Sequence, residues 1–134
     1  MSLRIHHVGI VVRDLEEASS AFERAFGAVS YERSAPSNSV RIAFARFANC
    51  ELELIQPLED SHPTATFLKE HGPGTHHIAV QVASAGETLQ SLIGAGFRVR
   101  ETVPRLGAAN SLVAWMDATS FAGVGVHIVE PHDE

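Results

Sequence analysis

The chain has 134 residues and a mass of 14.4 kDa, which is the size of one compact domain. Apolar residues make up 45% of the sequence and charged residues 19%, so the chain can bury a core and is neither disordered nor a coiled coil. The formal net charge is −6 with only ten Lys and Arg, and this balance argues against binding to nucleic acid or to an anionic membrane.

The N-terminal residues and the cysteine content indicate the compartment. Residues 1–5 lack the apolar stretch of a signal peptide, and no window approaches about 18 consecutive apolar residues, the length of a membrane span. Cys50 is the single cysteine and lies in an apolar run, so we expect it to be buried and without a disulfide partner. We therefore expect a cytoplasmic protein.

The first half of the chain is predicted to fold as βαβββ, because alternating β-branched residues indicate strands and apolar residues three or four apart indicate a helix. The predicted elements are a strand at 5–12, a helix at 15–27 capped by Asp14 and stopped by Gly27, a short strand at 29–33, and strands at 40–47 and 50–57.

The second half repeats this order. The predicted elements are a strand at 75–82, a helix at 86–96, a short strand at 97–101, a loop at 104–110, and strands at 111–117 and 123–130. Between the halves, the segment 59–74 is predicted to contain a short helix with Phe67 and Leu68 facing inward. The motif His-His-Val-Gly at 6–9 recurs as His-His-Ile-Ala at 76–79, an offset of 70 residues.

These repeats predict an α+β fold. A half of about 65 residues would be only marginally stable alone and would leave one sheet edge exposed. Pairing of the two halves would bury surface that neither half can bury alone. We expect a single domain over 1–134, built from module one (1–58), a linker (59–74) and module two (75–134). The two tandem βαβββ modules should pair into one curved mixed sheet around a cleft.

Side-chain alternation predicts which polar groups share the cleft face of this sheet. On each of four strands the apolar residues of one face must pack on the helices, which turns the intervening residues to the other face. The polar residues that this selects, one from each strand, are His7, Glu53, His77 and His127. Imidazoles and a carboxylate that converge form a divalent-metal site, although a buried histidine is also often purely structural. The same alternation places His6 and His76 on the helix side, as structural residues.

The sequence then resembles a known superfamily over nearly its entire length. The resemblance lies in the ungapped segment LELIQPLEDSHPTATFLKEHGPGTHHIAVQV at 52–82, the opening IHHVGIVV and the closing GVGVHIVEP. The chain is similar to the vicinal oxygen chelate (glyoxalase, bleomycin resistance and dioxygenase) superfamily, within which the methylmalonyl-CoA epimerase branch matches best. Extradiol dioxygenases are a weaker match, because their ligands are placed differently.

The resemblance implies a divalent metal ion (Co, Ni, Zn, Fe or Mn) held by His7, Glu53, His77 and His127. It also implies removal of a proton next to a carbonyl, through a metal-bound enolate, with Glu53 as the first candidate for the proton transfer. No other cofactor is implied. The family habit and the exposed sheet edges favour a homodimer, and spacing alone leaves open whether one chain or two complete each cleft.

Two departures from the epimerase pattern bear on the reaction. The fourth ligand position is typically glutamate in the epimerases and glyoxalases but is His127 here, so one carboxylate is lost. A second acid expected on the strand at 40–47 is absent, and Glu51 is either its substitute or a solvated edge carboxylate. Coenzyme A carries phosphate groups, which usually meet Lys or Arg side chains at the rim of a pocket. The chain has arginines that could take this role, so it allows an acyl-CoA substrate without requiring one. The candidates for that role are Arg41, Arg46, Arg98, Arg100 and Arg105.

Three functions remain open at this stage. The first is a metal-dependent isomerase or epimerase most like methylmalonyl-CoA epimerase, and the second is a glyoxalase-like lyase of the lactoylglutathione lyase type, with a glutathione adduct as substrate. The third is a ligand-sequestering protein of the bleomycin-resistance type, without catalysis. Small residues predicted along the cleft leave room for a small organic acid; these are Gly9, Ala43, Ala79 and Ala114.

Overall fold

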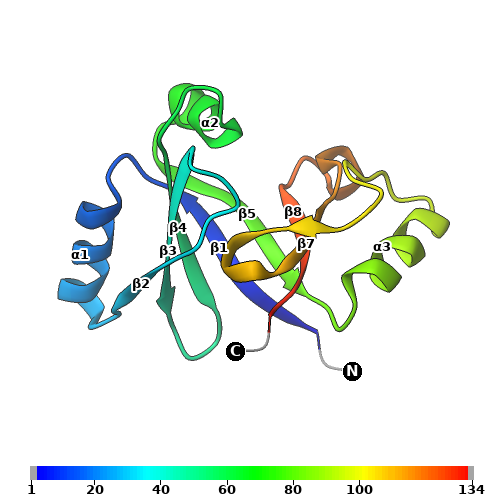
Figure 1. Ribbon diagram of the computed structural model, residues 1–134, viewed down its shortest axis with the longest axis horizontal. Coiled ribbons are helices and arrows are strands. Elements are labelled where there is room, and N and C mark those ends of the chain that lie inside the picture. The colour runs from blue at the N-terminus through cyan, green and yellow to red at the C-terminus, as the bar shows by residue number, and fades with distance from the viewer. Residues whose placement is uncertain (1–2, 133–134) are drawn as a thin grey trace.

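The computed structural model describes residues 3–132, which form eight strands and three α-helices arranged as two βαβββ halves joined by a helical segment (Figure 1). The elements of the first half are β1 (Arg4–Val11), α1 (Leu15–Phe26), β2 (Ser30–Arg33), β3 (Val40–Arg46) and β4 (Glu51–Pro57). Helix α2 (Pro63–His71) follows, and the second half comprises β5 (Gly74–Gln81), α3 (Ala85–Gly94), β6 (Arg105–Leu106), β7 (Leu112–Trp115) and β8 (Val126–Glu130).

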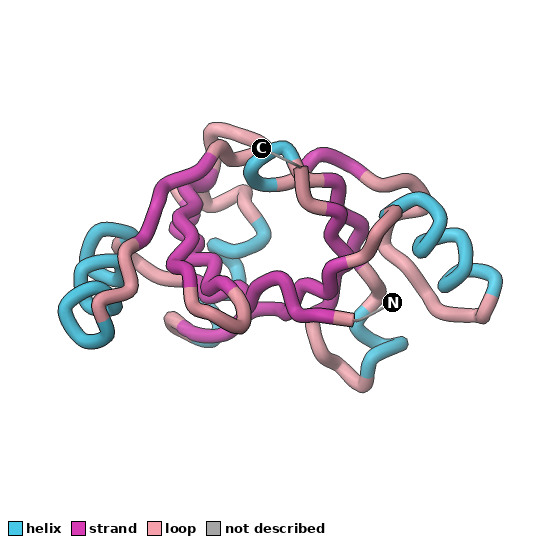
Figure 2. Tube along the Cα trace, turned by 90° about the horizontal axis from the view of Figure 1, so that it is seen from below, coloured by secondary structure: helices cyan, strands magenta, loops and turns pink. Residues whose placement is uncertain are grey.

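All eight strands belong to one sheet with the order β2-β3-β4-β1-β5-β8-β7-β6. Strands β1 and β5 pair antiparallel at its centre, and each pairs on its other side with the last strand of its own half, β4 or β8, in parallel. The sheet curls into an open ring, with α1 and α3 outside it at opposite ends (Figure 2). The predicted fold, an α+β protein with one curved mixed sheet, is confirmed. The module limits stay a prediction.

Equivalent hydrogen bonds begin the two outer helices. Asp14 accepts from the backbone N–H of Glu17 at 2.9 Å, and Ser84 accepts from that of Glu87 at 3.2 Å. Such N-caps satisfy backbone donors that the first helical turn leaves unpaired. A side-chain oxygen from the last strand of each half adds a second bond. Gln56 Oε1 accepts from Leu15 N–H and Glu130 Oε1 from Ala85 N–H, both at 2.9 Å.

Two apolar clusters fix the helices to the outer face of the sheet. The first contains Leu15, Ala43 and Leu54, and the second is centred on Leu89 and Ala114. The prediction that Ala43 and Ala114 line the cleft is therefore wrong. Their small side chains instead leave room for the helices to approach the sheet. The cleft face of β3 carries the larger residues Val40, Ile42 and Phe44.

Three local expectations are also wrong. The segment 97–101 is not a strand, because only Val99 forms a bridge, to Met116, while Arg98 N–H donates to the hydroxyl of Ser120. A short strand forms instead inside the predicted loop, at Arg105–Leu106. Cys50 is half-buried, since it lies in the turn that precedes β4.

The helix of the joining segment, α2, begins at Pro63 and ends at His71, and Gly72 follows it with a positive φ of 75°. Thr64 and Ala65 are its buried residues, whereas Phe67 and Leu68 are only half-buried. Within residues 3–132, no helix is both long and apolar enough to cross a membrane.

Candidate metal centre

The concave face of the sheet encloses a cavity of about 390 Å³ with apolar walls and a polar floor. Side chains of β3 and β4 form one wall, and those of β7 and β8 form the other. The apolar wall residues are Val40, Ile42, Phe44, Ile55, Val113 and Val129. All four sequence-predicted ligand residues line this cavity, so a single chain brings them together. Their role as ligands stays a prediction.

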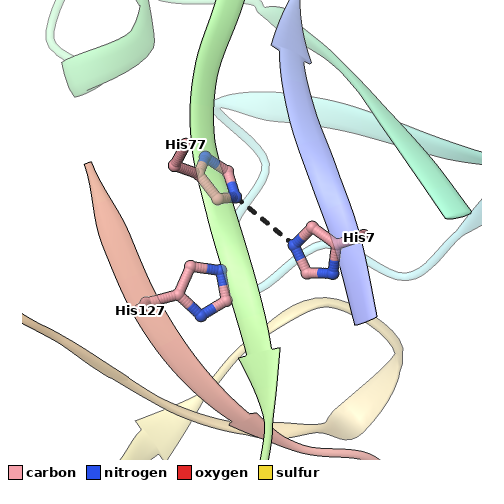
Figure 3. Close-up of side chains that lie close together, drawn as sticks. All are labelled: His7, His77 and His127. Carbon is pink, nitrogen blue, oxygen red and sulfur yellow. Dashed lines mark hydrogen bonds between the residues drawn. The ribbon is translucent and has the colours of Figure 1, made fainter. Parts of the chain in front are cut away.

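Three buried imidazoles meet on the floor of the cavity. His7 comes from β1, His77 from β5 and His127 from β8, and the three rings point toward one another (Figure 3). Each residue is 3–4% exposed, and one ring nitrogen of each lies within 4.8 Å of the others. The Nε2 atoms of His7 and His77 are 3.3 Å apart. Such spacing suits donor atoms that surround one ion.

The second nitrogen of each ring is held by a hydrogen bond. The Nδ1 atoms of His7 and His77 bond to the Nδ1 atoms of His6 and His76, at 2.8 and 2.9 Å. Nδ1 of His127 donates to the carbonyl oxygen of Ile128 at 3.1 Å. Since all three Nδ1 atoms are engaged, Nε2 is the nitrogen that each ring presents to the centre.

Glu53 of β4 adds one buried carboxylate to the imidazoles. Its Oε1 lies 3.3 Å from Nε2 of His77 and 3.5 Å from Nε2 of His7. Burial raises the pKa of Glu53 to about 7, and burial lowers the pKa values of His77 and His127 to about 4. Burial likewise holds the pKa of His7 well below its usual value. Neutral imidazoles and one carboxylate that converge in a buried space fit a divalent cation such as Zn, Ni, Co or Fe.

The placement of His6 and His76 corrects the sequence prediction. Both line the cavity instead of facing the helices. The reason is that the β1–β5 pairing is irregular at two points, between Ile5 and His7 and between Gly9 and Ile10. These bulges turn the preceding histidine to the same side as its neighbour, which an uninterrupted alternation forbids. The sequence feature that could have indicated this placement is the His-His pair, which occurs at the same point of both halves.

Gly9 makes room for one of the rings. It lies opposite His77 in the β1–β5 pairing, and a Cβ atom built on it would be 2.1 Å from Cε1 of His77. No side chain is compatible with the observed ring position. The equivalent residue of the other half, Ala79, pairs with His7 and does carry a Cβ atom in a fully buried place.

Charged residues surround the mouth of the cavity. Arg46 donates from Nε to Glu51 at 3.0 Å, and the Glu51 side chain is only 24% exposed, so Glu51 is an ion-paired rim residue and not a solvated edge carboxylate. Arg105 pairs with Glu101 and also lines the cavity. Arg33 lines it too, and sequence reasoning missed this residue because its strand, β2, reaches the cavity only through the curvature of the sheet.

The other candidate arginines do not line the cavity. Arg41 forms ion pairs with Glu16 and Glu32, on the outer side of the sheet. Arg100 lies over the ring of Trp115, 5.4 Å from its centroid, and Trp115 in turn packs against His77 and His127. Its ring centroid is 4.9 Å from that of His77 and 4.7 Å from that of His127. Trp115 was not predicted as a site residue.

The paired βαβββ sheet with a donor cluster in its concavity defines a protein of the vicinal oxygen chelate fold. A family model for the Glyoxalase/Bleomycin resistance protein/Dioxygenase superfamily matches residues 6–115, and the chain belongs to this superfamily.

Relatives with related sequences cover almost the whole chain. It is 33% identical over 129 residues to the uncharacterized protein YqjC of Bacillus subtilis, covering 96% of this chain and 92% of that protein. It is 32% identical over 128 residues to the ethylmalonyl-CoA/methylmalonyl-CoA epimerase of Cereibacter sphaeroides, covering 93% of this chain and 96% of the epimerase.

A solved methylmalonyl-CoA epimerase in complex with methylmalonyl-CoA and ammonium superimposes with a TM-score of 0.90. Its sequence identity is 25%, and the match covers 97% of this chain and 96% of that one. The named relatives thus support an epimerase-like role within the superfamily, at modest sequence identity.

Proposed function

We propose that this protein is a metal-dependent isomerase or epimerase that moves a proton at a carbon next to a carbonyl, most like methylmalonyl-CoA epimerase. The observation that carries the proposal is the buried group of His7, His77, His127 and Glu53 on the floor of a cavity that is large enough for a small acyl group. Relatives of similar length and the same fold are epimerases of acyl-CoA thioesters.

The four floor residues would hold a divalent ion, which supplies Lewis-acid stabilisation of the negative charge that develops on a carbonyl oxygen. Three neutral imidazoles and one carboxylate leave such a site with a net charge of about +1, since 2 − 1 = 1. A second carboxylate would bring this charge to zero. The histidine at position 127 therefore favours a stronger Lewis acid with fewer bases beside it.

The proton would be handled by Glu53, which lies on the cavity floor and whose burial raises its pKa to about 7. Without a bound ion this carboxyl group is therefore partly protonated near neutral pH, and a bound divalent ion would lower its pKa and favour the carboxylate form that accepts a proton. The other carboxylate among the described residues that line the cavity is Glu51, two residues away on the same strand. It is held by Arg46.

This arrangement also favours a second candidate, the glyoxalase-like isomerisation. Epimerisation by two bases needs an acceptor and a donor on opposite faces of the carbon, whereas isomerisation of the glyoxalase type uses one base. Because Glu51 and Glu53 project from one strand, both cavity carboxylates approach from the same side.

The acyl carrier would be coenzyme A. The epimerase structure cited above contains methylmalonyl-CoA, and the cavity mouth here carries Arg33, Arg46 and Arg105. Guanidinium groups at a rim suit phosphate groups that remain outside while the acyl group enters. The homodimer and the cytoplasmic location expected from the sequence stay predictions.

The proposal is tested by elemental analysis of untagged protein purified without chelator, before and after loading with Co²⁺. We expect about one ion per chain. Exchange of the α-hydrogen of methylmalonyl-CoA in D₂O then reports epimerisation, and absorbance of the thioester product reports isomerisation of a hemithioacetal.

The decisive variant is His77→Ala, with His71→Ala as its matched control. His71 lies on the exposed end of α2, 62% exposed at its side chain, and does not line the cavity. We expect His77→Ala to lose both the ion and the activity, and His71→Ala to keep both. Wild-type protein that binds no ion under any loading condition would contradict the proposal and would favour the ligand-sequestering alternative.

A further inference from the structure

We infer that His6 and His76 are positioning residues, each of which fixes the tautomer of the neighbouring imidazole so that His7 and His77 both present Nε2 to the ion. The inference rests on the proposed metal-dependent function, and it assigns a role to two histidines that the donor set itself does not use. It is carried by two hydrogen bonds and two bulges that repeat in equivalent places of the two halves.

The bulges bring consecutive histidines to one side of the sheet. Along the β1–β5 pairing, Ile5 lies opposite Val80 and His7 opposite Ala79, which leaves His6 without a partner residue. Further along, Gly9 lies opposite His77 and Ile10 opposite Thr75, which leaves His76 in the same situation. Bulges re-aim side chains, and here each one sets two imidazoles edge to face, with ring centroids 5.0 and 5.1 Å apart.

Counting protons then assigns the role. Two Nδ1 atoms that lie 2.8 or 2.9 Å apart share one proton, so one ring donates and the other accepts. A neutral imidazole that binds an ion through Nε2 carries its proton on Nδ1, and it must therefore be the donor. His6 and His76 must accept at Nδ1. The opposite arrangement would put a proton on Nε2 of His7 or His77, where the ion binds.

The third imidazole of the centre supports this assignment. Nδ1 of His127 donates to the carbonyl oxygen of Ile128, an acceptor whose role is fixed. On β1 and β5 the outer histidines are the hydrogen-bond partners of Nδ1, as this carbonyl is on β8. Partners of this kind, which orient a ligand without touching the metal, typically contribute ten- to hundredfold in metal affinity.

Aromatic neighbours hold the outer rings in these positions. The ring of His6 meets the edge of Phe44, with centroids 6.4 Å apart. The ring of His76 packs between Phe67 and Trp115, at 5.0 and 5.9 Å. Each outer histidine is half-buried, so its substitution removes little core packing.

The experiment compares Asn with Gln at positions 6 and 76. The side-chain amide of Asn places a hydrogen-bonding atom near the place of Nδ1, whereas the amide of Gln lies one bond further, near the place of Nε2. We expect His6→Asn and His76→Asn to bind Co²⁺ within about threefold of wild type. We expect His6→Gln and His76→Gln to bind it about ten- to hundredfold more weakly. Competition with a chromophoric chelator measures these affinities, and thermal unfolding checks that each variant is folded.

A spectroscopic readout separates positioning from packing. In Zn²⁺-loaded protein labelled with ¹⁵N-histidine, we expect wild type and the Asn variants to show His7 and His77 protonated at Nδ1 and coordinated at Nε2. In the Gln variants the Nδ1 resonance of the neighbouring ring should lose its hydrogen-bonded shift. His71→Gln, on the exposed end of α2, is the matched control and should leave both readouts unchanged.

Two results would overturn the inference. Equal Co²⁺ affinity of the Gln variants and wild type would show that the outer histidines contribute nothing to the ligands. Equal weakening by Asn and Gln would show that the ring volume matters and not the hydrogen bond. Both results presuppose that wild type binds the ion, so they are distinct from a failure of the proposed function, in which wild type itself binds none.

Discussion

The two halves of the molecule share a scaffold but differ in the residues that finish the site. Each half has a capped outer helix, a first strand with a bulged His-His pair, and a last strand that pairs in parallel with the first. At the cavity floor the halves diverge, because β4 supplies Glu53 and the equivalent strand β8 supplies His127. The repeated scaffold thus brings the donor side chains together, while the difference between Glu53 and His127 sets the net charge of the site.

A second asymmetry lies at the centre of the sheet. Gly9 of β1 lies opposite His77, whereas the equivalent Ala79 of β5 lies opposite His7. A Cβ atom at position 9 would overlap the ring of His77, while the Cβ atom of Ala79 is accommodated. The two central imidazoles are therefore packed differently, although their hydrogen bonds are alike.

Among the substitutions that distinguish the two halves, Gly9→Ala should have the largest effect on metal binding. In Gly9→Ala the new methyl group overlaps the His77 ring, so the ring must move, which removes one donor atom and disturbs a buried cluster. We expect Co²⁺ affinity to fall about a hundredfold, as for loss of a positioned ligand, together with a loss of about 1–3 kcal/mol in stability from the displaced ring. Chelator competition and circular dichroism measure the two quantities.

The matched control is Ala79→Gly, which places the same residue type at the equivalent site without displacing a ring. We expect near-wild-type Co²⁺ affinity together with a loss of about 1 kcal/mol in stability, from the flexible backbone of glycine in a strand. Wild-type metal affinity in Gly9→Ala would contradict the packing argument.

The pH dependence of the metal-free protein compares the two kinds of donor. Burial lowers the pKa values of His76, His77 and His127 from 6.5 to about 4, so the unfolded chain binds more protons than the folded one between these pH values. Stability therefore falls as pH decreases from 6.5 toward 4. Burial raises the pKa of Glu53 from 4.5 to about 7, which gives the opposite slope, but this one carboxylate is opposed by the three histidines and by His7, whose pKa burial also lowers.

We expect the unfolding temperature of chelator-treated protein to decrease steadily from pH 6.5 to pH 4.5, as measured by differential scanning calorimetry. His127→Gln should make this decrease less steep, since one titrating group is removed, whereas His71→Gln should not change it. An unfolding temperature that stays level or rises on acidification would show that the imidazoles are not held neutral by burial.

Much of this architecture was predictable, because it depends on local patterns. Caps, periodicity and the repeated His-His motif predicted the order of the elements and the paired sheet. The face shared by His7, Glu53, His77 and His127 came from alternation, which holds within each strand and agrees with the family resemblance. The structure places these four side chains around one cavity.

The errors arose where the chain departs from regular geometry. His6 and His76 were assigned to the wrong face because a bulge adds one residue and shifts the alternation. Arg33 and Trp115 were missed because the curvature of the sheet, which brings distant strands to one cavity, leaves no mark in a short stretch of sequence. The faces of regular strands and the meeting of the four donors were thus predictable, whereas the effects of the two bulges and the added neighbours Arg33 and Trp115 were not.

Replacement of the unequal donor should make the two halves chemically alike. In His127→Glu a second carboxylate brings the site with a divalent ion to a net charge near zero and places a base on the β8 side, opposite Glu53. We expect the ion to be retained and α-hydrogen exchange of methylmalonyl-CoA to increase about tenfold, within the range of general-base catalysis. His127→Gln, which adds no base, should not increase it. Loss of the ion in His127→Glu would show that the imidazole is required for another reason.

The smallest expected difference lies in the helix caps. Asp14→Ala and Ser84→Ala each remove one side-chain hydrogen bond, to the N–H of Glu17 or Glu87, and each should lower the free energy of unfolding by about 1 kcal/mol. Asp14 also places a negative charge at the positive end of α1, and Ser84 places none at α3, so the loss should be larger for Asp14→Ala.

Salt screens this charge, and urea unfolding in low and high salt should therefore show the two losses converging as salt increases. A difference between the caps that is unchanged by salt would assign it to hydrogen-bond geometry, since the Asp14 bond is 2.9 Å long and the Ser84 bond 3.2 Å. Metal content should be the same in both variants, because neither residue lines the cavity.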